Sequence, residues 1–286
     1  MIPADNPTST APRASASEAD PVLVRIDRHA SGIRVATVTI NNARRLNSLN
    51  SPLMQALVDA VDGLRAEAGA LEDPVRALVL TGAGEKAFVG GADIDEMAAL
   101  DAARARAFIT RVHRCCDAVR AFPAPVIARI QGYTLGAGLE LAAACDLRVA
   151  VDTAVLGMPE VKLGIPSVVE AALLPGLVGW GRTREMLLLG ENFGAAEALA
   201  WGLVERVVPF AGLDAQVDRW LGALAGTTPG AVRIQKHLIS RWETLPMDAA
   251  IQAGIDAFEA AWAGDEPSRA MAGFLEARRA HRGKAV

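Results

Sequence analysis

The chain has 286 residues with a net charge of −4, and 51% of its residues are hydrophobic and 22% charged. This composition is typical of a packed globular protein, and no segment reaches the roughly 18 unbroken apolar residues that a membrane-spanning helix needs. The acidic balance argues against a nucleic-acid binder, which usually presents a clustered basic face. We therefore expect a soluble protein without a membrane or nucleic-acid partner.

Three cysteines are present, Cys115 and Cys116 side by side and Cys145 apart. An odd number with this spacing fits neither a disulfide framework nor a metal site. The pattern favours buried thiols in a reducing compartment, and it predicts a cytoplasmic protein without a bound metal.

The chain opens with a segment, residues 1–20, that is rich in Pro, Ser, Thr and Ala and has no apolar core. It resembles neither a signal peptide nor a transit peptide, and we expect a disordered tail. Alternating runs at 22–27 and 35–40 then predict two strands joined by a turn. A helix is predicted to start at Ser51, because Pro52 follows and apolar residues then recur at helical spacing.

Strands and helices alternate through the middle of the chain. Buried strands are predicted at 76–82, 126–130 and 146–151, and a helix at 101–122. This alternation predicts an α/β domain over residues 21–212. Residues 213–286 show only helical patterns, which predicts a helical C-terminal region.

The most informative stretch follows the strand at 126–130, where a turn of Gly136, Ala137 and Gly138 leads into a helix with Glu140 in its first turn. The first amides of a helix lack intrahelical partners and lie at the positive end of its dipole, so this turn offers donors to an anion. A structural role is equally consistent with the segment. In that case the glycines let helix and strand pack closely, and Glu140 complements the dipole.

A second glycine turn, Gly90 and Gly91, ends an apolar run and again precedes a predicted helix. Two such turns can place two backbone donors around one oxygen, the arrangement that stabilises a developing oxyanion, with each donor contributing roughly 3 kcal/mol. A third segment, GMPEVKLGIPS, sets Glu160 beside Pro159. Taken alone, this segment predicts only an acid in a surface loop.

Other chemistries have little support in the sequence. The four histidines are scattered and none accompanies a nucleophile motif, which argues against Ser/His/Asp catalysis. Neither a GxxxxGKS/T phosphate loop nor a GxGxxG fingerprint after a strand is present. This argues against nucleotide hydrolysis and NAD-dependent redox chemistry.

Four segments resemble the enoyl-CoA hydratase/isomerase (crotonase) family, and the resemblance covers nearly the whole chain from Val22. In order, they are NNARRLNSLN, AFVGGADIDEM, GYTLGAGLELAAACDLRVA and MPEVKLGIP. The resemblance implies a crotonase-type α/β fold with a spiral core of ββα units over residues 21–212. It also implies that the helical region, residues 213–286, mediates a homotrimer or a hexamer made of two trimers and covers the coenzyme A site.

The resemblance further implies the roles of individual residues. Ala92 and Ala137 would supply the two N–H groups of an oxyanion hole that holds a thioester carbonyl oxygen. Glu140 and Glu160 fall on the family's two catalytic glutamates, which hold a water between them. One activates the water for attack at C3 of an enoyl thioester, and the other transfers a proton at C2. Because both acids are present, hydration is favoured over isomerisation, hydrolysis or dehalogenation.

Coenzyme A would then be part of the substrate, and no cofactor is expected. The resemblance implies coenzyme A contacts at Arg44, Arg45, Leu46, Gly91, Asp93 and Ile94. Arg278 and Arg279 lie where the family's C-terminal basic residues approach the nucleotide. For each arginine alone, a solvated surface position is an equally good interpretation.

The chain departs from the family's pattern at two places. Ala137 replaces a usual glycine, which is compatible with an N–H donor if its φ is negative. Residues 167–174, SVVEAALL, replace a glycine-rich stretch beside the site and add the acid Glu170. We predict an enoyl-CoA hydratase of fatty acid metabolism. Isomerisation or hydrolysis of an acyl-CoA, or a non-catalytic binding role, are the alternatives.

Overall fold

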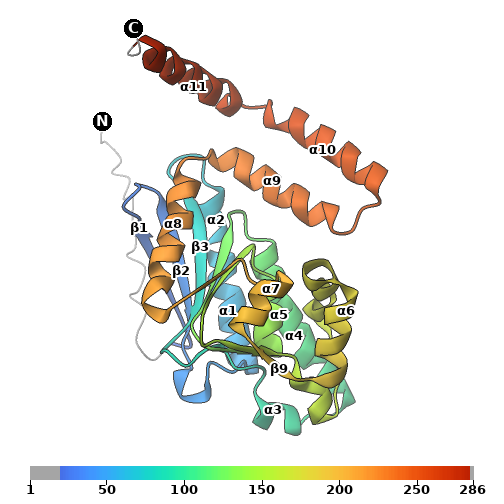
Figure 1. Ribbon diagram of the computed structural model, residues 1–286. Helices are drawn as coiled ribbons and strands as arrows, with labels where there is room; N and C mark the ends of the chain where they lie inside the picture. The colour runs from blue at the N-terminus through green and yellow to red at the C-terminus, as the bar shows by residue number, and fades with distance from the viewer. Residues whose placement is uncertain (1–19, 284–286) are drawn as a thin grey trace, which may run out of the picture.

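The computed structural model of the protein describes residues 20–283 (Figure 1). The tail expected over residues 1–20 lies outside these described residues, apart from Asp20. The described chain contains one sheet of six strands and a second sheet of four, with helices around them. This arrangement confirms the predicted α/β class.

The larger sheet has the strand order β1-β2-β3-β5-β7-β10. β1 (Val22–Arg28) and β2 (Arg34–Ile40) form an antiparallel hairpin. The remaining neighbours are parallel, and they are β3 (Val75–Gly82), β5 (Val126–Ile130), β7 (Leu147–Val151) and β10 (Arg206–Val208). All five strands that the sequence predicts are present, and the central ones are buried on both faces, as parallel strands covered by other layers must be.

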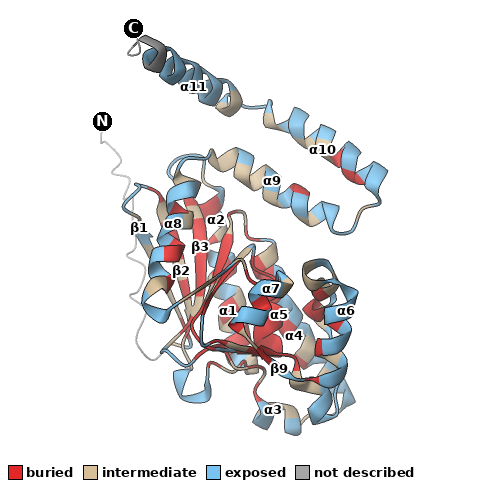
Figure 2. Cartoon of the chain, in the orientation of Figure 1, coloured by how far each residue is buried: buried red, intermediate tan, exposed pale blue. Residues whose placement is uncertain are grey.

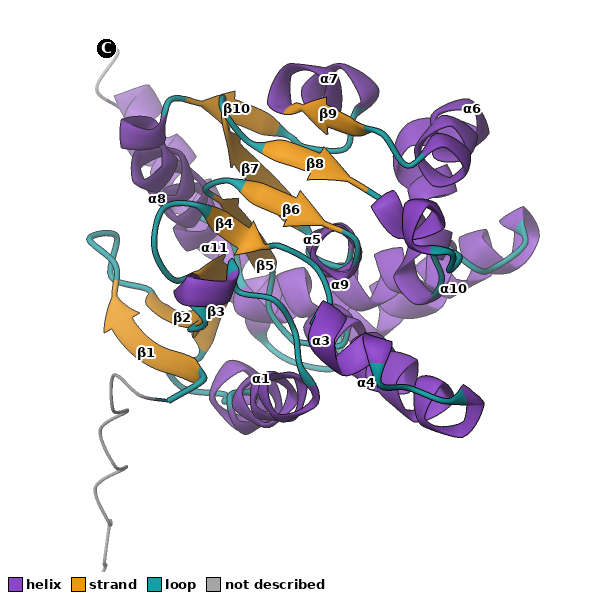
Figure 3. Cartoon of the chain, turned by 90° about the horizontal axis from the view of Figure 1, so that it is seen from below, coloured by secondary structure: helices purple, strands orange, loops and turns teal. Residues whose placement is uncertain are grey.

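The smaller sheet has no counterpart in the sequence-based prediction. Its order is β4-β6-β8-β9, and its strands are β4 (Ala87–Val89), β6 (Tyr133–Leu135), β8 (Val155–Gly157) and β9 (Asn192–Gly194). Runs of three residues are too short to display a period of two, so their sequences gave no strand signal. Figure 3 shows these short strands in a second layer beside the larger sheet.

The chain passes from the larger sheet to the smaller one and then into a helix three times. β3 leads to β4 and α3 (Ile94–Ala98), β5 to β6 and α5 (Ala137–Ala143), and β7 to β8 and a 3-10 helix, η2 (Pro159–Leu163). This path is the spiral of ββα units that the resemblance implies. Because β4, β6 and β8 are parallel neighbours, the turns that follow them meet at one edge of the smaller sheet.

The core lies between the sheets and the helices that follow them, as the buried residues in Figure 2 show. α1 (Ser51–Gly63) begins at the predicted residue, capped by the side chain of Asn50, and it packs against α4 (Ala102–Arg120). The other helical elements before Leu213 are η1 (Ala43–Arg45), α2 (Arg65–Gly69), η3 (Val169–Leu173), α6 (Leu174–Leu189), α7 (Ala195–Trp201) and η4 (Phe210–Gly212).

Two buried amide side chains connect the layers of the fold. Nδ2 of Asn47 donates to the carbonyls of Ala83 and Ala87 at 3.0 and 2.9 Å. Nε2 of Gln131 donates to the carbonyls of Gly82 and Ala87 at 2.6 and 2.7 Å. The Ala87 carbonyl therefore accepts from both amides, which fixes the start of β4 from two sides.

Between Leu213 and Gly283 the chain forms four helices, as predicted for a helical C-terminal region: α8 (Leu213–Ala225), α9 (Pro229–Trp242), α10 (Met247–Ala261) and α11 (Glu266–Gly283). α8 packs on the larger sheet and α10 on α9, whereas α11 projects beyond the sheets (Figure 1). α10 and α11 expose the large apolar side chains Ile251, Ile255, Phe258, Trp262, Met271 and Phe274. Within residues 20–283, no helix has the length and apolar character needed to cross a membrane.

Candidate active site

Glu140 is a buried acid in the first turn of α5. Only 4% of the residue is exposed. Burial, and next the nearby charge of Glu160, raise the pKa of its carboxyl to about 8, although backbone groups of Ala171 and Val168 act in the opposite direction. Glu140 therefore holds a proton at neutral pH, whereas the carboxyl of a solvent-exposed glutamate is ionised at that pH.

Glu160 lies against the turn that precedes α5. It belongs to η2, so the expectation of a surface loop at this position is replaced by a 3-10 helix. Its Oε2 accepts a hydrogen bond of 2.8 Å from the hydroxyl of Ser167, and its Oε1 occupies the space where a Cβ on Gly136 would lie. The missing side chain at Gly136 is thus what allows the Glu160 carboxyl to reach the start of α5.

The two glycine turns converge on the same place. A Cβ on Gly138 would collide with the Val89 carbonyl, so the first turn of α5 packs directly on the end of β4. Beyond β4, Gly91 adopts a φ of +116°, a conformation that strongly favours glycine. The sequence alone could not establish this convergence, because β4 and α5 are about 50 residues apart in the chain.

In the described part of the chain, the N–H groups of Ala92 and Ala137 lie where the secondary structure leaves a backbone donor without a partner. Leu49 forms a parallel bridge with Ala92, donating to the Gly91 carbonyl and accepting from the Asp93 N–H, both at 2.9 Å. In such a bridge the N–H of Ala92 points away from Leu49. Ala137 opens α5, where an N–H has no intrahelical partner, and the positive φ falls on Gly136 and not on Ala137.

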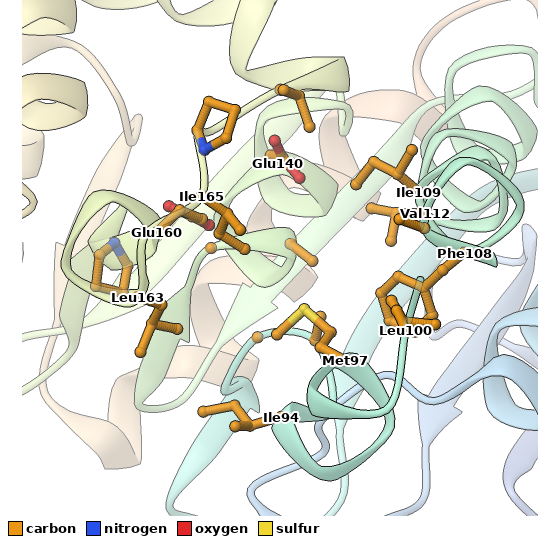
Figure 4. A pocket seen from close by; sticks show the side chains of 18 of the residues that line it. Ile94, Met97, Leu100, Phe108, Ile109, Val112, Glu140, Glu160, Leu163 and Ile165 are labelled. Atoms are coloured by element: carbon orange, nitrogen blue, oxygen red, sulfur yellow. The ribbon is translucent and has the colours of Figure 1, made fainter. Parts of the chain in front are cut away.

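A cavity of about 590 Å³ brings these groups together. Ala92, Ala137, Glu140 and Glu160 all line it. The rest of its wall is mostly apolar and comes from α3, α4 and the segment after η2, with Ile94, Met97, Leu100, Phe108, Ile109, Val112, Leu163, Ile165 and Val168. In Figure 4 the two glutamates lie on one side of the cavity and Phe108, Ile109 and Val112 on the other. The two acids thus face a mostly apolar wall across the cavity.

Of the residues expected to contact coenzyme A, some line the cavity and others form hydrogen bonds or ion pairs next to it. Gly91 and Ile94 line the cavity. The Asp93 side chain caps α3 by accepting from the Glu96 N–H at 3.1 Å. Arg45 forms ion pairs with Asp93 and Asp95, with N–O distances of 2.7 and 2.6 Å. Arg45 therefore already has carboxylate partners in the folded chain.

The remaining coenzyme A candidates are exposed. Arg44 is on the surface, and Leu46, with a φ of +54°, exposes 37% of its area beside Arg45. Arg278 and Arg279 lie on α11, which is at the other end of the molecule from α3 in Figure 1. The structure therefore does not bring these last two arginines to the cavity of their own chain.

Several residues at the site were not singled out as functional by the sequence. Ser167 bonds Glu160, and His113 on α4 bonds Glu170 with Nδ1 2.7 Å from Oε1. Residues 167–174 were marked only as a departure from the family, and no local motif connects them with α4. Within residues 20–283, no group of three or more His, Cys, Asp or Glu side chains is placed to hold a metal ion.

The chain is similar in sequence to known proteins. The sequence model of the enoyl-CoA hydratase/isomerase family matches residues 31–284. A short-chain-enoyl-CoA hydratase of Clostridium acetobutylicum is 34% identical over 247 residues, which cover 86% of this chain and 93% of that protein. A crotonyl-CoA hydratase of Syntrophomonas wolfei is 35% identical over 250 residues, with coverages of 87% and 94%.

The fold is also shared with solved structures. The crystal structure of an enoyl-CoA hydratase from Bacillus anthracis superimposes with a TM-score of 0.80 at 32% identity, over 88% of this chain and 96% of that one. An enoyl-CoA hydratase from Mycobacterium smegmatis gives a TM-score of 0.81 at 30% identity, with coverages of 88% and 96%. With the family model, the relatives and the fold in agreement over the same residues, this chain belongs to the enoyl-CoA hydratase/isomerase family.

Proposed function

We propose that the protein catalyses the reversible addition of water to a trans-2-enoyl-CoA, giving a 3-hydroxyacyl-CoA. One observation above all supports this proposal: Glu140 and Glu160 face one cavity whose wall also offers the free N–H groups of Ala92 and Ala137. The relatives that are named as hydratases for short enoyl-CoA and crotonyl-CoA substrates favour the same reaction.

The chemistry follows from where charge develops. Attack of a water oxygen at C3 of the conjugated thioester moves negative charge onto the carbonyl oxygen as an enolate. In our proposal, the N–H groups of Ala92 and Ala137 form the oxyanion hole that receives this charge. The enolate then takes a proton at C2, so the two hydrogens and the oxygen of one water end up on C2 and C3.

The acid pair has the protonation state that this reaction needs. One carboxyl must accept a proton from water while another donates one to C2. Glu140, with a pKa of about 8, retains a proton at neutral pH. The Ser167 hydroxyl donates to Glu160, which suits a carboxylate at that position. The pair thus has one proton to share, and we expect no metal or redox cofactor in the reaction.

The rest of the cavity suggests how the substrate lies. The apolar wall of Met97, Leu100, Phe108 and Val112 suits the hydrocarbon part of an acyl group. We propose that Leu46, Gly91, Asp93 and Ile94 border the pantetheine arm and that Arg44 approaches a phosphate, whereas Arg45 orients this edge through its bonds to Asp93 and Asp95.

We further propose that the protein forms a homotrimer or a hexamer made of two trimers, in the cytoplasm. Five large apolar side chains on α10, at its end and on α11 are exposed, and an exposed apolar surface of this kind is typical of a protein–protein contact: Ile251, Ile255, Phe258, Trp262 and Phe274. A second copy would cover this surface and bring Arg278 and Arg279 toward a neighbour's coenzyme A. The three free, buried thiols suit a reducing compartment. Light scattering on a gel-filtration column tests the assembly, and a monomer would contradict it.

The decisive experiment is incubation of the purified protein with crotonyl-CoA and with longer, branched and cyclic enoyl-CoA thioesters. Loss of the conjugated-enoyl absorbance and a product heavier by one water establish hydration. A product of unchanged mass with a moved double bond, or free coenzyme A, would instead assign isomerase or hydrolase chemistry. Residues 167–174, which depart from the family's pattern, are the part of the site that would explain such a result.

A further inference from the structure

A third acid, Glu170, lies behind the two glutamates of the cavity. The residue is 7% exposed and belongs to η3, outside the cavity wall. Its Oε1 is hydrogen-bonded to Nδ1 of His113 on α4. Its Oε2 is buried without a strong hydrogen-bond donor among the described residues, and the thiol of Cys116, a weak donor, lies beside the carboxyl. A buried carboxylate with so weak a donor at one oxygen is unfavourable, so a structural role alone does not account for this acid.

The short segment that carries Glu170 contacts both members of the acid pair. The hydroxyl of Ser167 donates to Glu160 at 2.8 Å. Backbone groups of Val168 and Ala171 interact with the carboxyl of Glu140. Residues 167–171 therefore link the two glutamates.

The same segment contains a strained backbone conformation at Val169. Val169 has a φ of +40°, which is a genuine outlier for a β-branched residue. Such conformations persist only where the surroundings over-determine them, and they cluster at functional sites. The bond between His113 and Glu170 ties the residue after Val169 to α4, so it opposes relaxation of the segment.

Titratable and charged groups lie on the elements around Glu170. α4 presents His113 and the thiols of Cys115 and Cys116, whose pKa values are raised first by burial and next by the charge of Glu170. α5 presents Glu140, and η2 presents Glu160 beyond it. On α6, Arg182 pairs with Glu185 and Arg184 lies over Trp180. Of the two cavity acids, Glu140 is the one whose carboxyl feels the charge of Glu170.

We infer that Glu170 is a positioning residue for the acid pair: held by His113, it fixes residues 167–171 against Glu140 and Glu160. An effect of Glu170 on kcat rests on the proposed hydration. An effect of Glu170 on the pKa of Glu140 does not, because it can be measured without substrate. The charge of Glu170 is one of the causes that raise the pKa of Glu140, in agreement with this geometry.

The first test measures the proton directly, without substrate. The pKa of Glu140 is followed by carbon-13 NMR of labelled glutamate side chains, with the Glu140 signal assigned by its loss in Glu140→Gln. We expect a lower pKa for Glu140 in Glu170→Gln than in the unmodified protein. Glu191→Gln is the matched control, because it removes an equal charge from the exposed pair with Lys162 and should leave the pKa of Glu140 unchanged. An unaltered pKa in folded Glu170→Gln would overturn the inference.

The second test measures positioning and does not depend on the Glu170 variant being stable. His113→Ala should lower kcat by about tenfold or more, since small misplacements of reacting groups reduce rates strongly. His113→Asn, whose amide can donate at nearly the place of Nδ1, should restore most of that loss. Equal kcat in His113→Ala and the unmodified protein would overturn the positioning role. If no thioester gains water even with the unmodified protein, the proposed function fails, and the NMR titration still decides the role of Glu170.

Discussion

Oε1 of Glu160 fills the space beside Gly136 that a Cβ would need. Gly136 also has a φ of +52° and precedes Ala137, one of the two proposed oxyanion donors. Gly136 therefore determines both the position of the Glu160 carboxyl and the backbone conformation at the start of α5.

Replacing Gly136 with Ala should lower kcat by about 10- to 100-fold, because the new methyl group must displace Glu160 and the positive φ strains the turn. Gly32→Ala is the matched control. Gly32 has a φ of +92° but open space around its Cβ position, and it lies in the β1–β2 turn far along the chain from the site. Steady-state kinetics should show full activity for Gly32→Ala, and an equal loss in both variants would point to a general folding defect.

Glu140→Gln and Glu160→Gln should each reduce turnover by at least ~100-fold, which is in the range measured for general acid and base groups. Both changes keep the size of the side chain and remove its ability to exchange a proton. Binding of a saturated acyl-CoA, measured by calorimetry, should stay largely intact. A variant with near-normal turnover would remove that residue from the mechanism.

The rate of hydration should fall as the pH rises through about 8. Glu140 has a raised pKa of about 8, chiefly because of burial, so above that pH the pair loses its shared proton. A profile of kcat/KM against pH reports these groups in the free enzyme. In Glu140→Gln, the basic limb should disappear from whatever activity remains, and its persistence would assign the limb to another group.

Glu140→Gln should make the protein more stable above about pH 5. In the folded chain the pKa of Glu140 is about 8, whereas a glutamate in the unfolded chain titrates near 4.5. The folded state therefore binds more protons between these values, so stability falls as the pH rises across that window. At about 1.4 kcal/mol per pKa unit, the loss is on the order of 5 kcal/mol when complete.

Thermal unfolding at pH 5 and pH 9 tests this expectation. The difference in Tm between Glu140→Gln and the unmodified protein should be small at pH 5 and large at pH 9. A difference that does not change with pH would mean that Glu140 is not a buried acid with a raised pKa. The glutamate would in that case be a poor candidate for holding the shared proton.

The sequence was most informative where a long pattern or a complete motif was present. The helix that starts at Ser51 and the strands of the larger sheet follow from apolar periodicity, and the motifs around Glu140 and Glu160 identified the family. The smaller sheet was missed because strands of three residues have no measurable period. These short strands are nevertheless the elements that bring the motif turns to one edge.

Contacts between distant segments were beyond sequence reasoning for a different reason. His113 and Glu170 are 57 residues apart, and their bond depends on how α4 lies against η3. The pKa of Glu140 likewise depends on burial and on neighbouring charges, neither of which a linear pattern records. The sequence therefore predicts which residues are the catalytic candidates. It does not predict the protonation of Glu140 or the hydrogen bonds that hold the segment beside it.

Because Asn47 and Gln131 both donate to the Ala87 carbonyl, substitutions in different parts of the fold should affect acyl specificity differently. β4 ends two residues before the turn of Gly91 and Ala92, and its start is held by amides that do not line the cavity. Changes in the acyl wall, such as at Met97, can alter chamber shape while leaving this anchor in place. New acyl specificities are thus accessible by single substitutions, whereas a change at Asn47 or Gln131 would disturb every substrate alike.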